Sequence, residues 1–279
     1  MRKLLLCTAA LSLSGCSFMG MGGQPAYNQT TVYGGPAYAS PAPVSRCPSG
    51  NCYSRINLEG GIGVASAIDG TMFVGEDTDP ATNGGQLQNG GTDRVYDTGY
   101  RAELGGSYAI NPNTKMSLLG HYEKAESSGV KNYGQIFGAN FNGSFSDYET
   151  YGVEAGLRHY FRPQRGFILR TIRPYVEGRV GVSRTEDIQI QNATLGGVQF
   201  GDGNINFYDD SWVASGAGLV GVETPLTRYS TIGIETGLRY TTGLDADNSE
   251  ILPGTPLAGS NSGGSNLSVP LMLRGRYRF

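Results

Sequence analysis

The chain has little charge, and its two signs nearly balance. Lys and Arg together number 21 and Asp and Glu number 24, so 16% of the 279 residues are charged and the formal net charge is −3. A protein that binds nucleic acid needs a basic surface to neutralise phosphates, and this composition does not supply one. Nucleic acid is therefore not expected among the partners of this protein.

Long apolar runs are also scarce, and the one near the N-terminus is short. Arg2 and Lys3 precede an apolar run over residues 4–13, which is typical of a secretory signal and too short to span a bilayer as a helix. The tetrapeptide Leu13-Ser14-Gly15-Cys16 resembles the bacterial lipobox. The resemblance implies a signal peptide over residues 1–15 and lipid attachment at Cys16; an ordinary signal peptide with a coincidental cysteine is the alternative.

Cysteines are few, and two of the four are accounted for by this N-terminal segment. Cys7 lies within the expected signal and Cys16 at the expected lipid site, which leaves Cys47 and Cys52. Four residues including Pro and Gly separate this pair, so in an oxidising compartment we expect a small disulfide loop. A metal site would need more ligands nearby, so no metal and no cofactor are expected. Residues 16–53 are otherwise rich in Gly, Pro, Ala and Tyr without periodicity, which indicates a flexible periplasmic linker or a periplasmic contact segment.

The most informative stretch is the last one, residues 266–279. One alternate set of residues is mostly apolar (Leu267, Val269, Leu271, Leu273), whereas the other contains Arg274, Arg276 and Arg278. A β-strand sends alternate side chains to opposite faces, so this stretch predicts a two-faced strand about twice the usual length of 5–6 residues. The chain ends on Phe279.

Seven further stretches alternate in the same way. Together with the last one they lie at residues 55–66, 96–110, 115–124, 146–161, 172–185, 208–224, 230–242 and 266–279. The phase of 208–224 is ambiguous, although Glu223 favours Trp212 facing outward. Long connections follow the first, third, fifth and seventh stretches and short ones follow the others, which is the pattern of a barrel with long loops at one end.

The strand count, the alternating loop lengths and the terminal Phe resemble the small eight-stranded outer-membrane barrels of the OmpA transmembrane domain/OmpX type. The resemblance implies an all-β, eight-stranded antiparallel up-and-down transmembrane β-barrel over residues 54–279. It further implies outer-membrane lipids as partners, recognition of the strand ending at Phe279 by the barrel-assembly machinery, a periplasmic N-terminal anchor and extracellular long loops. A soluble lipocalin-like barrel, with large apolar residues inside, is the alternative.

In the membrane barrel the charged residues of these strands point into the lumen. Charges removed from bulk water must pair, so we expect a salt-bridged plug, with a narrow gated pore as the alternative. Arg274 and Arg276 are expected to face Glu59 and, on the neighbouring strand, Glu235. The expected lumen set is Arg55, Glu59, Arg101, Glu103, Glu123, Glu154, Arg158, Arg173, Glu177, Arg179, Glu223, Glu235, Arg239, Arg274 and Arg276. Aromatic rims are expected at Tyr96, Tyr100, Tyr151, Trp212 and Tyr240 and, at the other end, at Tyr108, Phe161, Tyr229, Tyr277 and Phe279.

Histidine, the usual base in nucleophilic catalysis, is nearly absent. The chain has only His121 and His159, and neither shows the His-x-Ser spacing of one family of lipid deacylases. We therefore expect no catalytic residues and no enzyme. The expected role is structural or interactive: envelope integrity, adhesion, or binding of an extracellular or periplasmic protein partner through the loops. A small gated channel is the second reading and a lipid-modifying enzyme the third.

Overall fold

The computed structural model describes residues 55–75, 87–161, 172–199, 202–227, 229–247, 257 and 259–279. The chain divides into two units, Met1–Ser40 and Pro41–Phe279, and every described residue belongs to the second. Cys16, Cys47 and Cys52 lie outside the described residues, as do the expected signal peptide and linker. Lipidation and the disulfide therefore stay predictions.

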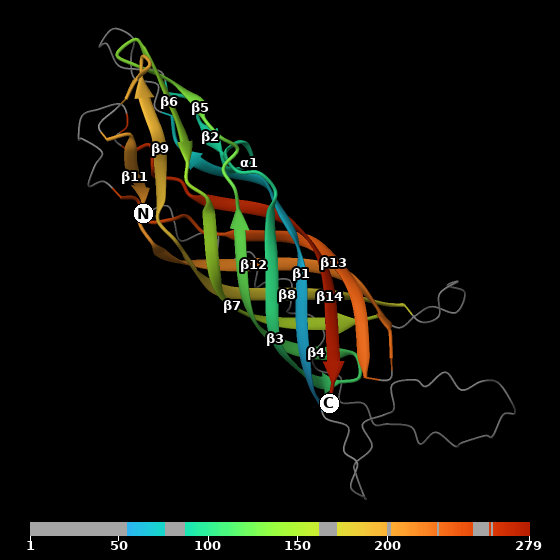
Figure 1. Cartoon of the computed structure of the whole chain (residues 1–279). Helices are drawn as coiled ribbons and strands as arrows, with labels where there is room; N and C mark the ends of the chain where they lie inside the picture. Colours follow the sequence, from blue (N-terminus) through green and yellow to red (C-terminus); the bar gives the residue numbers. More distant parts are fainter. Residues whose placement is uncertain are drawn as a thin grey trace, which may run out of the picture. The chain divides into compact units, whose positions relative to one another are not determined.

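Eight antiparallel strands close into a barrel (Figure 1). Neighbours in the sheet follow one another along the chain, and β14 returns to pair with β1 from Asn57↔Arg278 to Thr71↔Ser265. The predicted fold class is confirmed, because all eight alternating stretches form barrel strands. These strands are β1 (Ile56–Phe73), β3 (Gly99–Asn111), β4 (Thr114–Ala125), β7 (Tyr148–Tyr160), β8 (Arg173–Thr185), β12 (Ser211–Pro225), β13 (Ser230–Thr241) and β14 (Ser265–Arg278).

Large apolar side chains cover the outer wall of the barrel. Each of the eight strands presents at least one aliphatic residue that is more than half exposed, and we call this set the apolar belt. Its members include Ile62, Leu104, Leu118, Val153, Val180, Val220, Ile234 and Leu271. Glutamates and arginines of the same strands are buried. This inside-out arrangement is that of a barrel solvated by lipid, and it rules out the lipocalin-like alternative.

The strand whose phase was ambiguous, β12, follows the same rule. Trp212 is 67% exposed, whereas its neighbour Val213 is 2% exposed and Glu223 is buried. Trp212 lies opposite Arg184 of β8 in the register of the two strands. Glu223, near the end of β12, therefore indicates which alternate residues of this strand face inward, because a buried carboxylate needs the charged partners that the lumen offers.

A second sheet rises from two of the long connections that were expected to be loops. We call it the cap, and Figure 1 shows it at the barrel end opposite the C-terminus. Its strands run in the order β10-β9-β6-β5, and β11 also pairs with β9. They are β5 (Lys131–Ile136), β6 (Ala139–Phe145), β9 (Ile188–Leu195), β10 (Val198–Gln199) and β11 (Asn204–Tyr208). Two further short elements, β2 (Gly90–Gly91) and α1 (Thr92–Val95), lie between β1 and β3.

The cap and the upper barrel share one aromatic core. Phe73, at the end of β1, stacks on Tyr133 of β5 with ring centroids 5.1 Å apart and on Phe207 of β11 at 5.6 Å. Phe145 of β6 meets Phe207 edge-on at 5.4 Å. Large rings bury much apolar area and gain further from such geometries, so the cap is a folded extension of the barrel.

Tyr96 belongs to this core, which corrects the expectation that it lies in the aromatic rim. It is buried among the cap residues, with its ring 5.7 Å from that of Tyr148. The other aromatic residues expected at the two rims are exposed. Within the described part of the chain, no helix has the length and apolar character needed to cross a membrane.

Candidate functional site

The lumen is the most highly charged part of the barrel, and its charges balance. Seven glutamates face six arginines and Lys115, all less than a tenth exposed, and every barrel strand contributes at least one of them. We call this set the lumen network. Its members are Glu59, Glu103, Glu123, Glu154, Glu177, Glu223, Glu235, Arg101, Arg158, Arg179, Arg239, Arg274, Arg276 and Lys115.

Arg179 stands at the centre of the lumen network. Its guanidinium lies 2.9 Å from Glu103, 2.9 Å from Glu177 and 2.6 Å from Glu235. Arg274 of β14 lies 2.8 Å from Glu235, the partner expected on the neighbouring strand, and 3.2 Å from Glu103. Each carboxylate here meets more than one guanidinium, which is the geometry that a buried charge needs to offset its lost hydration.

Arg158 organises the layer nearer the short turns. Its guanidinium lies 2.7 Å from Glu177, 2.8 Å from Glu223 and 3.1 Å from Glu59. Arg276 lies 2.8 Å from Glu223, so its partner comes from β12, two strands away in the sheet. The lumen network therefore joins strands that are not hydrogen-bonded neighbours.

Two tyrosines close the end of the lumen that carries the short turns. Tyr160 and Tyr175 are fully buried, with ring centroids 5.5 Å apart. The Tyr160 hydroxyl donates to Glu223 at 2.8 Å, and the Tyr175 hydroxyl donates to Glu235 at 2.9 Å. The guanidinium of Arg173 covers the Tyr160 ring at 4.6 Å. Neither tyrosine was singled out in the sequence, although each lies on the charged face of its strand.

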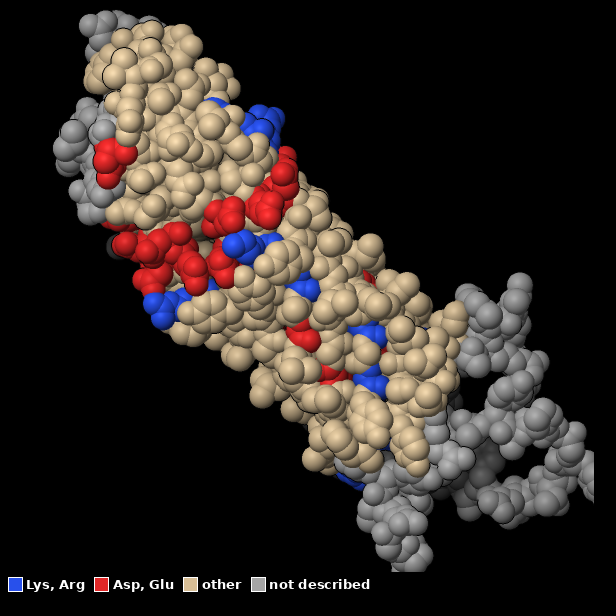
Figure 2. All heavy atoms as spheres, in the orientation of Figure 1, with Lys and Arg blue, Asp and Glu red and all other residues tan. Residues whose placement is uncertain are grey.

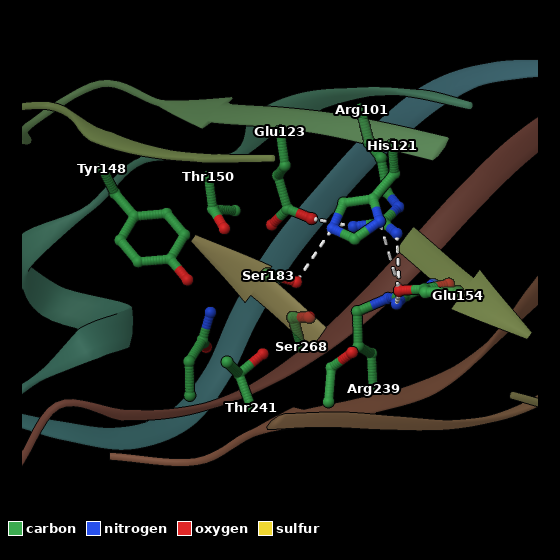
Figure 3. A pocket seen from close by; sticks show the side chains of 12 residues that line it. Arg101, His121, Glu123, Tyr148, Thr150, Glu154, Ser183, Arg239, Thr241 and Ser268 are labelled. Carbon is green, nitrogen blue, oxygen red and sulfur yellow. Dashed lines mark hydrogen bonds and ion pairs between the residues drawn. The ribbon is translucent and has the colours of Figure 1, made fainter. Parts of the chain in front are cut away.

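Near the cap, a histidine and a serine lie beside the lumen network (Figure 3). Arg101 lies 2.8 Å from Glu103, 2.7 Å from Glu123 and 2.9 Å from Glu154. Arg239 also pairs with Glu154, from nearly across the lumen. These contacts hold Glu154 between two guanidinium groups.

His121 links Glu154 to Ser183. Its Nε2 lies 3.1 Å from the Ser183 hydroxyl, and its Nδ1 lies 3.7 Å from a Glu154 oxygen. The order carboxylate, imidazole, hydroxyl is that of a catalytic triad, but a triad also needs a reachable nucleophile. His121 and Ser183 are both buried. The space beside them measures about 10 Å³, which is close to the least that holds one water molecule. The Ser183 hydroxyl therefore has no room beside it for a substrate in this structure.

The outer wall carries a larger hollow. It is a shallow depression of about 700 Å³, and its side chains belong to the apolar belt and to the aromatic rim near the cap. Its larger lining side chains are Ile62, Leu104, Tyr122, Tyr151, Val153 and Trp212. A lipid-facing groove of this composition accommodates acyl chains and offers no chemistry.

On the face that Figure 2 shows, a band of charged residues lies between the apolar belt and the cap, and we call it the charged ring. Lys124 lies 3.3 Å from Asp147 and 3.5 Å from Glu149, and Arg184 pairs with Asp210. Acidic residues predominate nearby. Loss of hydration, together with Asp247 and Asp187, raises the pKa of Asp209. The described residues contain no cluster of His, Cys, Asp and Glu that could hold a metal ion.

All the charged residues expected in the lumen are buried except Arg173, which is half-buried, and Arg55, whereas Cys16, Cys47 and Cys52 lie outside the described residues. Arg55 is exposed at the start of β1, where it donates to the Tyr108 hydroxyl at 3.2 Å, so it is not a lumen residue. The reason is its place just outside the first paired residue of the strand, where the guanidinium can stay hydrated. Lys115 was missing from the predicted set, although it alternates in phase with Glu123 on β4.

Comparisons with known proteins do not name a family for this chain. No family model matches the chain, and no curated protein matches it. The neisserial surface protein A structure is 14% identical with a TM-score of 0.43, and the match covers 81% of this chain and 98% of that one. The outer membrane protein AlkL, in lipid bilayers, is 15% identical (TM-score 0.41; 83% and 93% covered). The outer membrane protein OprG from Pseudomonas aeruginosa is 14% identical (TM-score 0.39; 81% and 97% covered).

Proposed function

We propose that this protein is a closed outer-membrane β-barrel that anchors a folded cap outside the cell, with a structural or surface-interaction role. The observation that supports this proposal best is the filling of the barrel. The lumen network occupies the interior, Tyr160 and Tyr175 lie across one end, and the cap core lies over the other. A protein built in this way has its accessible chemistry on the cap, since loops held on a rigid scaffold are where recognition usually lies.

The proposed orientation follows from the arrangement of connections. Short turns join β3 to β4 and β12 to β13, whereas the cap grows from connections at the other end. In outer-membrane barrels the short turns face the periplasm. The N-terminal side of β1 lies at the same end as these turns, which agrees with a periplasmic linker and a lipid on Cys16.

The channel reading has less support. Conduction would need a continuous water path, but Arg158 and Arg179 each meet at least three carboxylates, and the space beside His121 and Ser183 measures only about 10 Å³. Opening such a path would break several buried ion pairs at once, each of which is costly to break. The enzyme reading has less support still, because Ser183 and His121 lie beneath the cap.

Photo-crosslinking in intact cells tests the proposed role. A photoreactive amino acid is placed at Gln191 on the cap, at Val220 in the apolar belt, or at Asn113 in the turn between β3 and β4. All three positions lie outside the lumen, so none disturbs its ion pairs. We expect macromolecular adducts from Gln191 and only lipid adducts from Val220.

Asn113 is the control position, and its adducts distinguish an error in the proposed orientation from an error in the proposed role. Adducts to cell-surface macromolecules from Asn113 and none from Gln191 would reverse the proposed orientation. Only lipid adducts from all three positions would contradict a surface-interaction role, provided that heat-dependent gel mobility shows each variant to be folded.

A further inference from the structure

The strands of the cap are almost free of charge. β6, β9, β10 and β11 contain no Asp, Glu, Lys or Arg, and β5 contains only Lys131 at its first position. The barrel strands below them are rich in buried charge, and the ring between the two is acidic. An uncharged sheet that stands in water must instead be solvated by neutral polar groups.

The register of the cap strands shows where these groups lie. Directly opposed residues of antiparallel strands share a face, so Asn132 of β5, Asn142 of β6 and Thr194 of β9 form one row across three strands. Aromatic and aliphatic neighbours of this row, such as Tyr133 and Phe141, point the other way into the shared core. The row therefore lies on the outer face of the cap.

A second row repeats the arrangement. Ser144 of β6, Gln191 of β9 and Asn204 of β11 are directly opposed, and Gln135 lies opposite Asn140 at the far end of β5 and β6. Asn132, Gln135, Asn140, Gln191 and Asn204 are exposed. Asn142 is half-buried, and we call these six Asn and Gln residues the carboxamide face.

The chemistry of the carboxamide face is distinctive. Each Asn or Gln side chain carries a carbonyl acceptor and an amide with two donors in one plane, and no member of the rows carries charge. Gln135 already donates to Asn140 at 3.2 Å across the strands, which shows the two amides lying within reach of each other. Neighbouring strands are spaced about 4.8 Å apart, so the rows bring donors and acceptors of different strands close together.

We propose that the carboxamide face binds a neutral polysaccharide. A hexose unit offers adjacent hydroxyl groups that each donate and accept, and a planar carboxamide can satisfy two of them at once. The acidic residues beneath the cap would repel an anionic polymer, and no member of the carboxamide face is basic, Lys131 being the single basic residue of the cap strands. The aromatic core behind the sheet holds the face rigid, which lowers the entropic cost of binding.

This proposal rests on the proposed function, because it needs the cap to be folded and outside the cell. Its failure can be told apart from failure of the proposed function, because binding is tested with purified protein and does not depend on where the cap lies in the cell. The test uses the full chain in detergent and measures retention on immobilised dextran, mannan and galactan, with dextran sulfate as the anionic comparison.

Two matched double variants make the test specific. N132D/Q191E places two nearly isosteric carboxylates in separate rows of the carboxamide face. N111D/N113D makes the same change of charge in the turn between β3 and β4, at the opposite end of the barrel, where Asp can replace the Asn111 side chain that accepts from the Asn113 backbone. Hydrogen exchange of the core amides of β9 reports whether the cap stays folded.

We expect retention on at least one of the three neutral polymers and none on dextran sulfate. Affinity should fall about tenfold or more in N132D/Q191E, because two hydrogen-bonding groups are lost, and stay unchanged in N111D/N113D. If no neutral polymer is retained, or if dextran sulfate alone is retained, the proposal is overturned. Equal binding by N132D/Q191E and wild type, or self-association of the wild type that only this variant abolishes, also overturns it. If N132D/Q191E loses cap protection, Q191A is measured in its place and judged by the same outcomes.

Discussion

The guanidinium of Arg179, on β8, lies 2.9 Å from the carboxylate of Glu103, on β3. Three steps around the barrel separate these strands, so the contact crosses the lumen instead of joining neighbours. A hydrogen-bonded sheet fixes each strand only to the two beside it. Ion pairs such as this one also join strands across the lumen, and their side chains fill the interior of the barrel.

Removing Arg179 should therefore destabilise the barrel strongly. Arg179→Met leaves Glu103, Glu177 and Glu235 without their shared partner, and breaking a buried pair in this way costs about 3–5 kcal/mol. The measurement is equilibrium unfolding of the protein in vesicles by guanidinium chloride, followed by Trp212 fluorescence.

Arg184→Met is the matched control. Arg184 lies on β8 like Arg179, but its ion pair with Asp210 is exposed. Exposed pairs contribute little. Equal destabilisation by the two variants would show that burial of Arg179 does not matter, contrary to the filled-barrel description.

The apolar belt can be tested with two valines of nearly equal exposure. Val180 on β8 is 68% exposed and Val198 in the cap is 71% exposed, but only Val180 belongs to the belt. Arginine at Val180 should cost about 2–4 kcal/mol if that position lies near the middle of a bilayer. Arginine at Val198, in water, should cost almost nothing. The measurement is folding of each variant into vesicles, followed by gel mobility. Equal folding of the two variants would contradict the placement of the apolar belt in the membrane.

Alkaline pH should loosen the cap before the barrel. Burial raises the pKa of Tyr133, and burial likewise raises the pKa of Tyr208, whose hydroxyl donates to the Met72 carbonyl at 2.8 Å. When the pKa of a tyrosine is higher in the folded state than in the unfolded state, its contribution to the free energy of unfolding is fully present below the unfolded-state pKa of about 10. That contribution is lost as the pH rises toward the folded-state pKa. Proteolysis of the cap should accordingly increase above about pH 10.

The Tyr133 hydroxyl offers a sharp comparison, because it is buried without a hydrogen-bond partner. Tyr133→Phe should keep the cap folded at neutral pH and shift the unfolding of the cap to higher pH. The substitution removes a buried hydroxyl that has no hydrogen-bond partner and whose ionisation destabilises the cap. A variant whose alkaline transition stays where the wild type has it would show that other groups control the cap.

Heat should change the gel mobility of the whole protein. Closure of β14 onto β1 leaves no free edge, so the barrel should persist in detergent and run faster unheated than heated. A protein that shows one mobility under both conditions, and that is soluble without detergent, would not be a membrane barrel.

The sequence revealed the barrel because alternation has a physical cause that a single chain displays. Leu271 and Leu273 on one face, and Arg274 and Arg276 on the other, fit only a strand with different solvents on its two faces. Glu223 resolved β12 for the same reason. Lumen residues were recognisable as charges in strands, although the identity of each partner depended on the tilt and stagger of strands that the sequence does not reveal.

The cap could not be predicted in the same way. Ile alternates with Gln over residues 188–191 of β9, and Phe141 of β6 lies between Asn140 and Asn142, which is a short strand signal. The signal was overlooked because the segments lie in connections rich in Gly, Asn and Ser, and because a short strand is stable only once its partner is known. Tyr96 was misplaced for the same reason, since its neighbours come from the cap.

Single-channel recording in planar bilayers tests the central claim, that the barrel is closed, most directly. Purified full-length protein should show no steady openings, and Y160A/R158A, which removes one closing tyrosine and the arginine that holds Glu59, Glu177 and Glu223, should conduct if it folds. Steady large openings by the wild-type protein, with unheated gel mobility showing it to be folded, would contradict the closed barrel and support a channel.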